Sequence, residues 1–411
     1  MEARLASLQL RRIIREPHLE DVRILERNAV QTGAENVVVS AAADQLHVYD
    51  DAHLGRHLDM FMAYRAWDCD VFTACCFVLP VLSERECHWL EQVVEAAHRS
   101  AAVPDVWIAA GGKRGRVRLL SVAQAREMLV VDHVSGNNLS DVDDEGRGEA
   151  VVALTAHPHV AGVWASASAH SIAVWRVGER SDGARLVLRI RVPQVTALAF
   201  RPDGRLYGAC GHPPQIIEWE VPSSLAAERA DHIDAAAIPE WTSHNGRVLV
   251  TRLAASADAL RCLPAGLLVK CGDHLRWLAY TDGSSLLPAN QHPKRDGLLR
   301  IPGGAAPTAS IDVRAISDAT TGAEDTLVAV GGGQGMAHVF RLSDGKRVAS
   351  VGHPRVRGAL GGCLFGSDGE TMLVAHQQCL LRYVATAIDA ADPVEETNAR
   401  KGVAESVPAT A

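Results

Sequence analysis

Seven short segments of this chain share one design, and that design restricts the folds open to it. In each, β-branched and aliphatic residues alternate, a polar or Gly-rich turn follows, and a second alternating run ends in an aromatic residue or Leu. This pattern is typical of two strands joined by a tight turn. The segments are 37–50, 106–120, 163–175, 205–219, 267–277, 327–340 and 372–383.

The segments recur at intervals of about 40 to 60 residues, which is typical of a β-propeller, whose blades are four-stranded sheets of about 40–45 residues. Seven blades of that length use about 300 residues. The chain has 411, which leaves room for insertions and tails. The predicted fold is therefore all-β: a seven-bladed WD-repeat β-propeller with helical and loop insertions.

Signals inside the blades support this interpretation. Residues 154–175 have the shape of a WD-repeat blade: an apolar strand, a His-Pro turn, a strand of small residues, and a hairpin whose second strand ends in Trp. Residues 195–210 and 358–375 repeat its opening, with Asp-Gly turns in which Gly suits the φ > 0 position. The Asp that usually precedes the closing Trp by six residues is missing, because Ala169 and Pro213 stand there instead.

The predicted organisation has three parts. Residues 1–18 form an N-terminal arm or entering strand, 19–388 the propeller, and 389–411 a polar tail expected to be disordered. A capping box at Ser83 and Glu86 predicts a helix over 83–100. The propeller insertions are expected at about 83–104, 135–149, 222–245 and 281–308.

Composition excludes several classes of protein. The formal net charge is −8 and the pI about 6.1, whereas strong nonspecific binding to nucleic acid requires a basic face. The nine cysteines include no C-x-x-C pair and no signal peptide precedes them, which favours reduced thiols in the cytosol or nucleus. The longest apolar run, near 71–82, is too short for a membrane span. We expect a soluble intracellular protein without a membrane partner.

No catalytic, metal or cofactor site stands out. His157 and His159 flank a proline in a turn and lack a second ligand pair. Cys271 precedes Asp273 and His274, but neighbours on a hairpin point to alternating faces. The Gly-rich run 330–335 lacks the Lys-Ser/Thr of a phosphate loop. A propeller hydrolase is therefore disfavoured, and we expect a noncatalytic protein with no cofactor and no metal.

Five segments resemble the extra sex combs / embryonic ectoderm development family of WD-repeat proteins. The first blade of that family is similar to 35–76, its second to 106–122, and its third, with a His-Pro turn and a closing Trp, to 149–177. An acidic-aromatic insertion after the fourth blade is similar to 238–250, and the fifth blade to 267–277. The resemblance runs in order over about 20–385.

This resemblance implies a noncatalytic subunit of a Polycomb repressive complex 2-like histone H3 lysine methyltransferase in the nucleus. In that family the bottom face of the propeller cradles a helix of the SET-domain catalytic subunit, and a zinc-finger Polycomb subunit is a further partner. The top face holds an aromatic cage that reads trimethyl-lysine on the histone H3 tail. The alternative is a WD-repeat adaptor in ubiquitin ligation, RNA processing or trafficking.

The resemblance also indicates candidate histone-contacting residues. At most of the positions where the family has cage aromatics, this chain has other residues. Phe72 falls where the family has a cage Tyr, although it could equally be an ordinary strand aromatic. Alignment of 310–317 with the family's Ile-Trp-Tyr-Met-Arg-Phe-Ser stretch places Ile311 and Asp312 at two cage positions and retains Arg314. Cys271, in the Lys-Cys pair of the fifth blade, completes the set.

The missing rings predict a weak histone site. Each ring of a cage contributes about 0.5–2 kcal/mol to binding a quaternary ammonium. A lysine ammonium could instead pair with Asp312, an exposed interaction worth roughly 0–1 kcal/mol. We therefore expect weak or absent reading of trimethyl-lysine.

Overall fold

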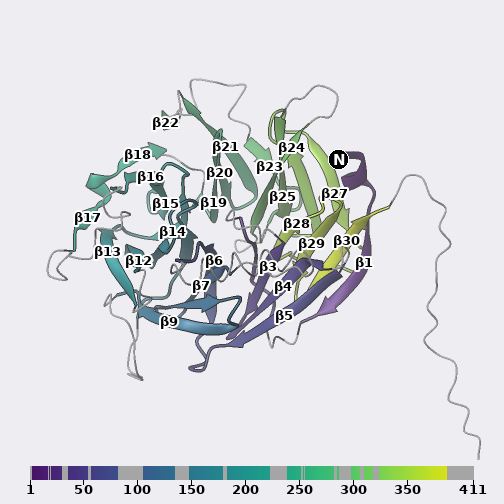
Figure 1. Ribbon diagram of the computed structural model, residues 1–411. Coiled ribbons are helices and arrows are strands. Elements are labelled where there is room, and N and C mark those ends of the chain that lie inside the picture. The colour runs from purple at the N-terminus through teal and green to yellow at the C-terminus, as the bar shows by residue number, and fades with distance from the viewer. Residues whose placement is uncertain are drawn as a thin grey trace, which may run out of the picture.

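The computed structural model describes residues 2–16, 18, 20–29, 36–53, 57–81, 105–134, 148–178, 183–222, 238–250, 253, 255–281, 285–286, 298–305, 310–317 and 324–386. These residues form seven β-sheets arranged as blades around a central axis (Figure 1). The prediction of a seven-bladed β-propeller is confirmed. No helix in the described part is long and apolar enough to cross a membrane.

In each blade the strands follow one another outward from the axis. The blades are I, β2 (Ile24–Arg27), β3 (Val37–Ala42), β4 (Gln45–His53) and β5 (His57–Arg65); II, β6 (Phe72–Val78), β7 (Trp107–Gly112), β8 (Arg116–Ser121) and β9 (Arg126–Asp132); III, β10 (Ala153–Ala156), β11 (Val163–Ala167), β12 (Ser171–Val177) and β13 (Ala184–Arg191); and IV, β14 (Val195–Phe200), β15 (Arg205–Gly211), β16 (Pro214–Glu220) and β18 (Arg247–Val250).

The remaining blades follow the same order. They are V, β19 (Ala259–Leu263), β20 (Gly266–Cys271) and β21 (His274–Thr281), with β22 (Ser285–Leu286) and β23 (Leu298–Arg300) both pairing with β21; VI, β24 (Ile311–Ser317), β25 (Glu324–Gly331), β26 (Met336–Arg341) and β27 (Arg347–Gly352); and VII, β28 (Gly362–Phe365), β29 (Thr371–His376), β30 (Cys379–Ala385) and β1 (Leu8–Arg15). A short strand, β17 (Glu240–Thr242), adds to blade III in parallel with β13, and a 3₁₀ turn, η4 (Ser243–Asn245), follows it.

The ring is closed by the N-terminus, so the predicted N-terminal arm contains a strand of the propeller. Strand β1 pairs antiparallel with the C-terminal β30 and becomes the outer strand of blade VII, and the two lie side by side in Figure 1. The short helix α1 (Glu2–Ala6) precedes β1 and buries Leu5. The Glu2 carboxylate accepts from Arg341 Nη2 at 2.8 Å, which fixes α1 to blade VI.

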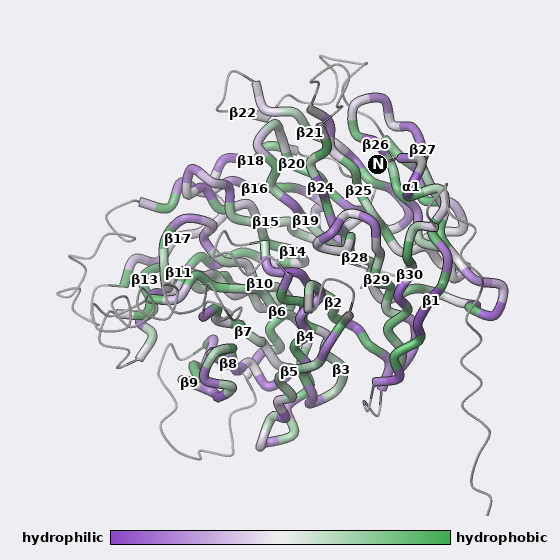
Figure 2. Tube along the Cα trace, turned by 45° about the vertical axis from the view of Figure 1, so that its right-hand side comes forward, coloured by the Kyte–Doolittle hydropathy of each residue, from purple (hydrophilic) through white to green (hydrophobic). Residues whose placement is uncertain are grey.

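Apolar side chains fill the spaces between and within the blades, and polar residues collect at the turns (Figure 2). The predicted closing residues Trp175 and Trp219 are fully buried, whereas Trp277 is half-buried. Trp175 stacks on Trp164 with ring centroids 6.3 Å apart. Fully buried Trp side chains therefore lie in blades III and IV, and other buried aromatic side chains occur in blades I, II, VI and VII.

Two of the predicted tight turns form as expected, because each places Gly in the left-handed region. Gly204 has φ +90° and its N–H donates to Arg201 O at 3.0 Å; Gly369 has φ +70° and donates to Gly366 O at 3.0 Å. The predicted helix over 83–100, the tail 389–411 and most of the other predicted insertions lie outside the described residues.

Candidate functional site at the central channel

The innermost strands of six blades surround a central cavity of about 370 Å³. Its lining comes from β2, β6, β10, β14, β19 and β24, together with residues that precede these strands. We call the face where the innermost strands begin the top and the face where they end the bottom. Propellers bind ligands and partners at the two ends of the central channel, so the residues that line the channel are the first candidates for a functional site.

An ion pair crosses this channel. Arg261, on β19 of blade V, donates from Nη2 to the carboxylate of Glu26, on β2 of blade I, and from Nε to Ile311 O at 3.2 Å. Burial raises the pKa of Glu26, and the Arg261 guanidinium opposes that rise. The pair therefore ties together blades that are distant in the ring, and it leaves Glu26 without the freedom expected of a catalytic acid or base.

Hydroxyl groups along the channel also make hydrogen bonds to backbone carbonyl groups, most of them on other blades. Thr196 Oγ1 donates to Ala257 O at 2.7 Å, and Ser310 Oγ donates to Leu25 O at 3.0 Å. Thr73 Oγ1 donates to Gly111 O at 3.1 Å and to the carbonyl oxygen of the loop before β10. The polar groups of the channel wall thus hold the ring together.

The structure brings two of the predicted site residues to this cavity, but their side chains point into the core. Phe72 and Ile311 both line the cavity, with exposed fractions of only 1% and 0%. The Phe72 ring packs against Tyr64 with centroids 6.3 Å apart, inside the apolar cluster of blades I and II. Ile311 packs with Leu268 and Phe340. These positions do not present an aromatic cage.

The two charged candidates, Asp312 and Arg314, make hydrogen bonds to the backbone at the turn between β28 and β29. Asp312 Oδ2 accepts from Phe365 N at 2.8 Å and its Oδ1 from the backbone N of the next residue. Arg314 donates to Gly366 O and, at 3.1 Å, to Ser367 O. The sequence predicts a carboxylate able to pair with lysine, whereas in the structure both Asp312 oxygens accept hydrogen bonds from backbone amides in the wall between blades VI and VII.

Cys271 ends the second strand of blade V, is buried, and does not line the cavity. Burial raises the pKa of its thiol to about 11, so the thiol is protonated at neutral pH and is a poor nucleophile. Of the five candidates, only Phe72 and Ile311 line this cavity.

One recurring arrangement is not evident from the sequence. In it, polar side chains of the loop that precedes a blade pair with polar side chains inside that blade. In blade II the fully buried Arg118 pairs with Asp68 at 2.5 Å and with Asp70 at 3.5 Å. In blade V the buried Lys270 pairs with Asp258 at 3.1 Å. Charges buried in this way are tolerated because they are paired.

In blade III the same arrangement is a hydrogen-bond network in place of an ion pair. His133 Nδ1 lies 2.7 Å from Ser166 Oγ and His133 Nε2 lies 3.1 Å from Ser171 Oγ, while Trp175 Nε1 donates to Ser166 Oγ at 2.8 Å. Burial lowers the pKa of His133 to about 4. Ser171, two residues after Ala169, thus provides a hydrogen-bond partner near the position of the missing Asp. In the sequence, the Ser in the strand before the closing Trp was the feature that could have predicted this network.

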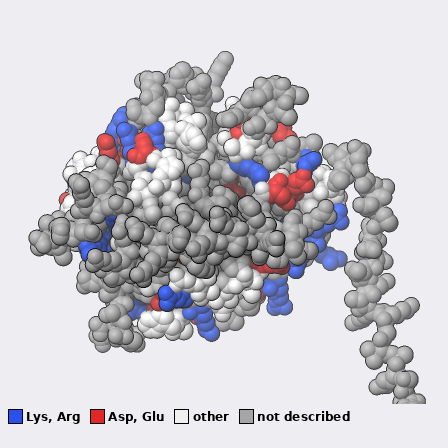
Figure 3. Space-filling view, viewed as in Figure 1, with Lys and Arg blue, Asp and Glu red and all other residues white. Residues whose placement is uncertain are grey.

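Exposed apolar side chains mark the top face over blade II. Trp67 is 57% exposed and Val134 45% exposed, and the Arg116 guanidinium lies over the Trp67 ring, 5.9 Å from its centroid. Lys113 and Arg114, in the turn between β7 and β8, are also exposed on this face. Elsewhere, basic and acidic side chains mix around the rim of the face drawn in Figure 3.

Comparison with known proteins gives a match only among solved structures. No family model and no curated protein matches the chain. A chain of "Chaetomium thermophilum Polycomb Repressive Complex 2 bound to GSK126" matches with a TM-score of 0.62 and 11% identity, over 92% of this chain and 98% of that one. A chain of "Apo ctPRC2 in an autoinhibited state" has the same score and identity, over 93% and 99%. A humanized mutant of the Chaetomium complex gives 0.60 and 11%, over 93% and 98%.

The likeness is one of fold. At 11% identity it shows that this chain and chains of Polycomb Repressive Complex 2 structures share a propeller over nearly their whole lengths. The resemblance found in the sequence is confirmed at that level. In all, 1380 chains of solved structures match, so the propeller alone does not determine a function.

Proposed function

We propose that this chain is a noncatalytic propeller scaffold of a Polycomb repressive complex 2-like histone H3 lysine methyltransferase. In this role it docks the SET-domain catalytic subunit and a zinc-finger Polycomb subunit in the nucleus and so supports transcriptional repression. The observation that carries the proposal is the nearly full-length match to chains of Polycomb Repressive Complex 2 structures, which agrees with the ordered resemblance of five segments.

The chemistry of the channel supports a scaffold role. Glu26 is paired with Arg261, and Asp312 is engaged by backbone amides. The Cys271 thiol, with its pKa raised by burial, stays protonated at neutral pH. These groups stabilise the ring, and the surfaces of the propeller remain for binding other proteins. We propose that the SET-domain subunit lays an amphipathic helix into a groove of the bottom face, a known mode of recognition.

Reconstitution tests this proposal. The full-length chain is combined with its SET-domain and zinc-finger partners from the same source, and methylation of nucleosomal histone H3 is measured with and without it. We expect no activity from the chain alone and strong stimulation of the assembled enzyme. Unchanged methylation when this chain is omitted would refute the scaffold role.

The large number of propellers of this fold favours one alternative, a WD-repeat adaptor in ubiquitin ligation, RNA processing or trafficking. Affinity purification of the full-length chain followed by mass spectrometry distinguishes the two. Recovery of a SET-domain protein with a zinc-finger partner supports the methyltransferase, whereas cullin, spliceosomal or coat components support the adaptor.

A further inference from the structure

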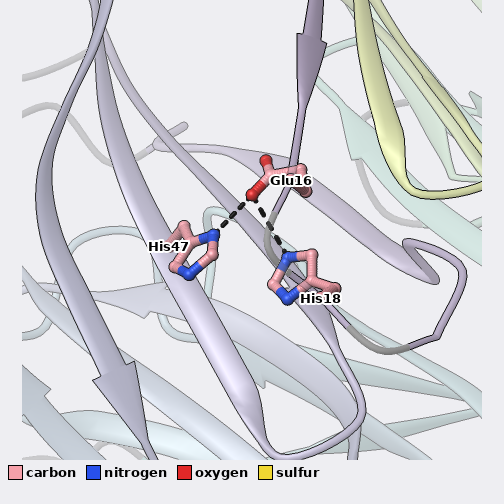
Figure 4. Close-up of side chains that lie close together, drawn as sticks. All are labelled: Glu16, His18 and His47. Atoms are coloured by element: carbon pink, nitrogen blue, oxygen red, sulfur yellow. Dashed lines mark hydrogen bonds and ion pairs between the residues drawn. The ribbon is translucent and has the colours of Figure 1, made fainter.

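Three residues of types that commonly bind metals meet where the ring closes. Glu16 directly follows the closing strand β1, His18 lies two residues later, and His47 lies on β4 of blade I (Figure 4). Their exposed fractions are 2%, 4% and 3%. The sequence gives no sign of a metal site here, because Glu16 and His47 come together only when the ring closes.

The three side chains converge on one point. Their ligand atoms lie within 4.8 Å of one another. Glu16 Oε2 is 3.3 Å from His18 Nε2 and makes a hydrogen bond with His47 Nδ1. The two imidazole rings stack with centroids 4.4 Å apart and planes 14° apart. In Figure 4 one nitrogen of each ring points toward the carboxylate.

Neighbouring hydroxyls fix the carboxylate in an orientation suited to a metal ligand. Glu16 Oε1 accepts from Ser40 Oγ at 2.9 Å and from Tyr49 OH at 2.6 Å, which leaves Oε2 facing the imidazoles. Outer hydrogen bonds of this kind orient and tune the ligands of protein metal sites.

His18 supplies a separate indication of a ligand. Its side chain is fully buried, and neither ring nitrogen makes a hydrogen bond of normal geometry among the described residues, although Glu16 and Gln45 are polar neighbours. By contrast, both nitrogens of His133, the buried histidine of blade III, have hydroxyl partners. A buried polar group without a partner is costly, and a bound ion would satisfy it.

We propose that Glu16, His18 and His47 bind a divalent transition-metal ion, with Zn²⁺ as the first choice. Two imidazoles and one carboxylate form a donor set typical of zinc, with a fourth position for water. The ion stabilises the ring closure, because it joins the segment after β1 to blade I. It favours the folded chain, in which the three ligands are assembled, over the unfolded one.

The test uses the full-length protein, stripped of metal with a chelator and dialysed against Zn²⁺. We expect one zinc ion per chain by elemental analysis and a melting temperature raised by roughly 5 °C at saturating metal. His18→Ala and His47→Ala should each weaken zinc binding by at least about 100-fold, since even outer-sphere changes cost 10–100-fold. The matched control is His133→Ala, which removes an equally buried histidine and should keep the zinc stoichiometry and the zinc-dependent rise.

Cobalt gives an independent readout on the unmutated chain, in case a variant fails to fold. Co²⁺ bound at this site should show visible d–d absorption without thiolate charge-transfer bands, because the site contains no cysteine. Absence of stoichiometric metal binding, or binding unchanged in His18→Ala, would overturn the proposal and leave a metal-free hydrogen-bond network. Thiolate bands would assign the metal to cysteines elsewhere and overturn it equally.

Discussion

At the scale of single residues, His133 makes the stability of the protein depend on pH. Its folded-state pKa is about 4, against about 6.5 in an unfolded chain. Below pH 6.5 the unfolded chain therefore binds a proton that the folded chain excludes, and the free energy of unfolding decreases as the pH is lowered. The contribution is fully present above pH 6.5, and about 3 kcal/mol is lost by pH 4. His157, whose pKa burial also lowers to about 4, acts in the same direction.

Urea unfolding at pH 7, 6, 5 and 4 measures this dependence. We expect His133→Asn to be less stable at pH 7 but to lose less stability on acidification than the unmutated chain, with His170→Asn, an exposed histidine, as the control. Equal pH slopes for all three proteins would show that His133 does not titrate as described.

Phe72 gives the second prediction at this scale. Because its ring is 1% exposed and packed in the core, Phe72→Ala should lower the free energy of unfolding by about 3–5 kcal/mol. Calorimetric titration of the full-length chain with histone H3 peptides should show no strong preference for trimethyl-lysine. Micromolar, methylation-dependent binding that Phe72→Ala abolishes in a folded variant would show that a cage exists.

Sequence reasoning could identify these residues but not their environment. Alternation shows which residues share a face of a strand, yet it does not show whether that face meets the channel or the next blade. Asp312 illustrates this, because its backbone partner Phe365 lies on another blade, 53 positions away. Glu16 and His47 are 31 positions apart and meet only through ring closure.

At the scale of elements, β1 carries the closure of the ring. It covers β30 with an antiparallel ladder, and Glu16 N donates to Gln378 O at 2.8 Å just after it. Deleting residues 2–15 should expose the β30 edge and lower the melting temperature by more than about 8 °C, and the exposed strand should promote self-association.

Differential scanning calorimetry and size-exclusion chromatography check this. The control is Ile13→Ala, which trims a side chain of β1 that is 59% exposed and should change stability by less than about 0.5 kcal/mol. A truncated chain that stays monomeric with an unchanged melting temperature would show that β1 is dispensable.

The elements that the sequence predicted best are the second and third strands of the blades. All seven predicted hairpins coincide with such pairs, for example β3 with β4 and β29 with β30. These strands are buried on both sides and joined by short turns, so their pattern is strong. The outer strands carry a weaker signal. The membership of β1 in blade VII could not be predicted, because its partners lie at the opposite end of the chain: Thr386 Oγ1 donates to Ser7 O across 379 positions.

At the scale of the whole molecule, the Glu26–Arg261 pair links blades I and V across the channel. Removing one partner of a buried ion pair costs about 3–5 kcal/mol. These side chains are 21% and 38% exposed, so we expect a smaller loss, about 2 kcal/mol, for Arg261→Met. Glu26→Gln combined with Arg261→Met should recover part of it, because no unpaired charge remains. Urea unfolding of the four proteins in a double-mutant cycle measures the coupling, and strictly additive losses would show that the two blades are not coupled.

The last prediction concerns which face of the ring binds the catalytic partner. If the SET-domain subunit lays a helix into the bottom face, a charge placed on that face should weaken assembly. His159 lies in the exposed turn between β10 and β11 on the bottom, and Lys113 is exposed in the turn between β7 and β8 on the top. Neither side chain is buried, so His159→Glu and Lys113→Glu should both fold normally and serve as controls for one another. We expect His159→Glu to reduce recovery of the SET-domain subunit in co-purification and to lower methylation in the reconstituted enzyme, while Lys113→Glu leaves both near the unmutated level. The reverse result would assign the partner to the top face, over blade II, where Trp67 is exposed.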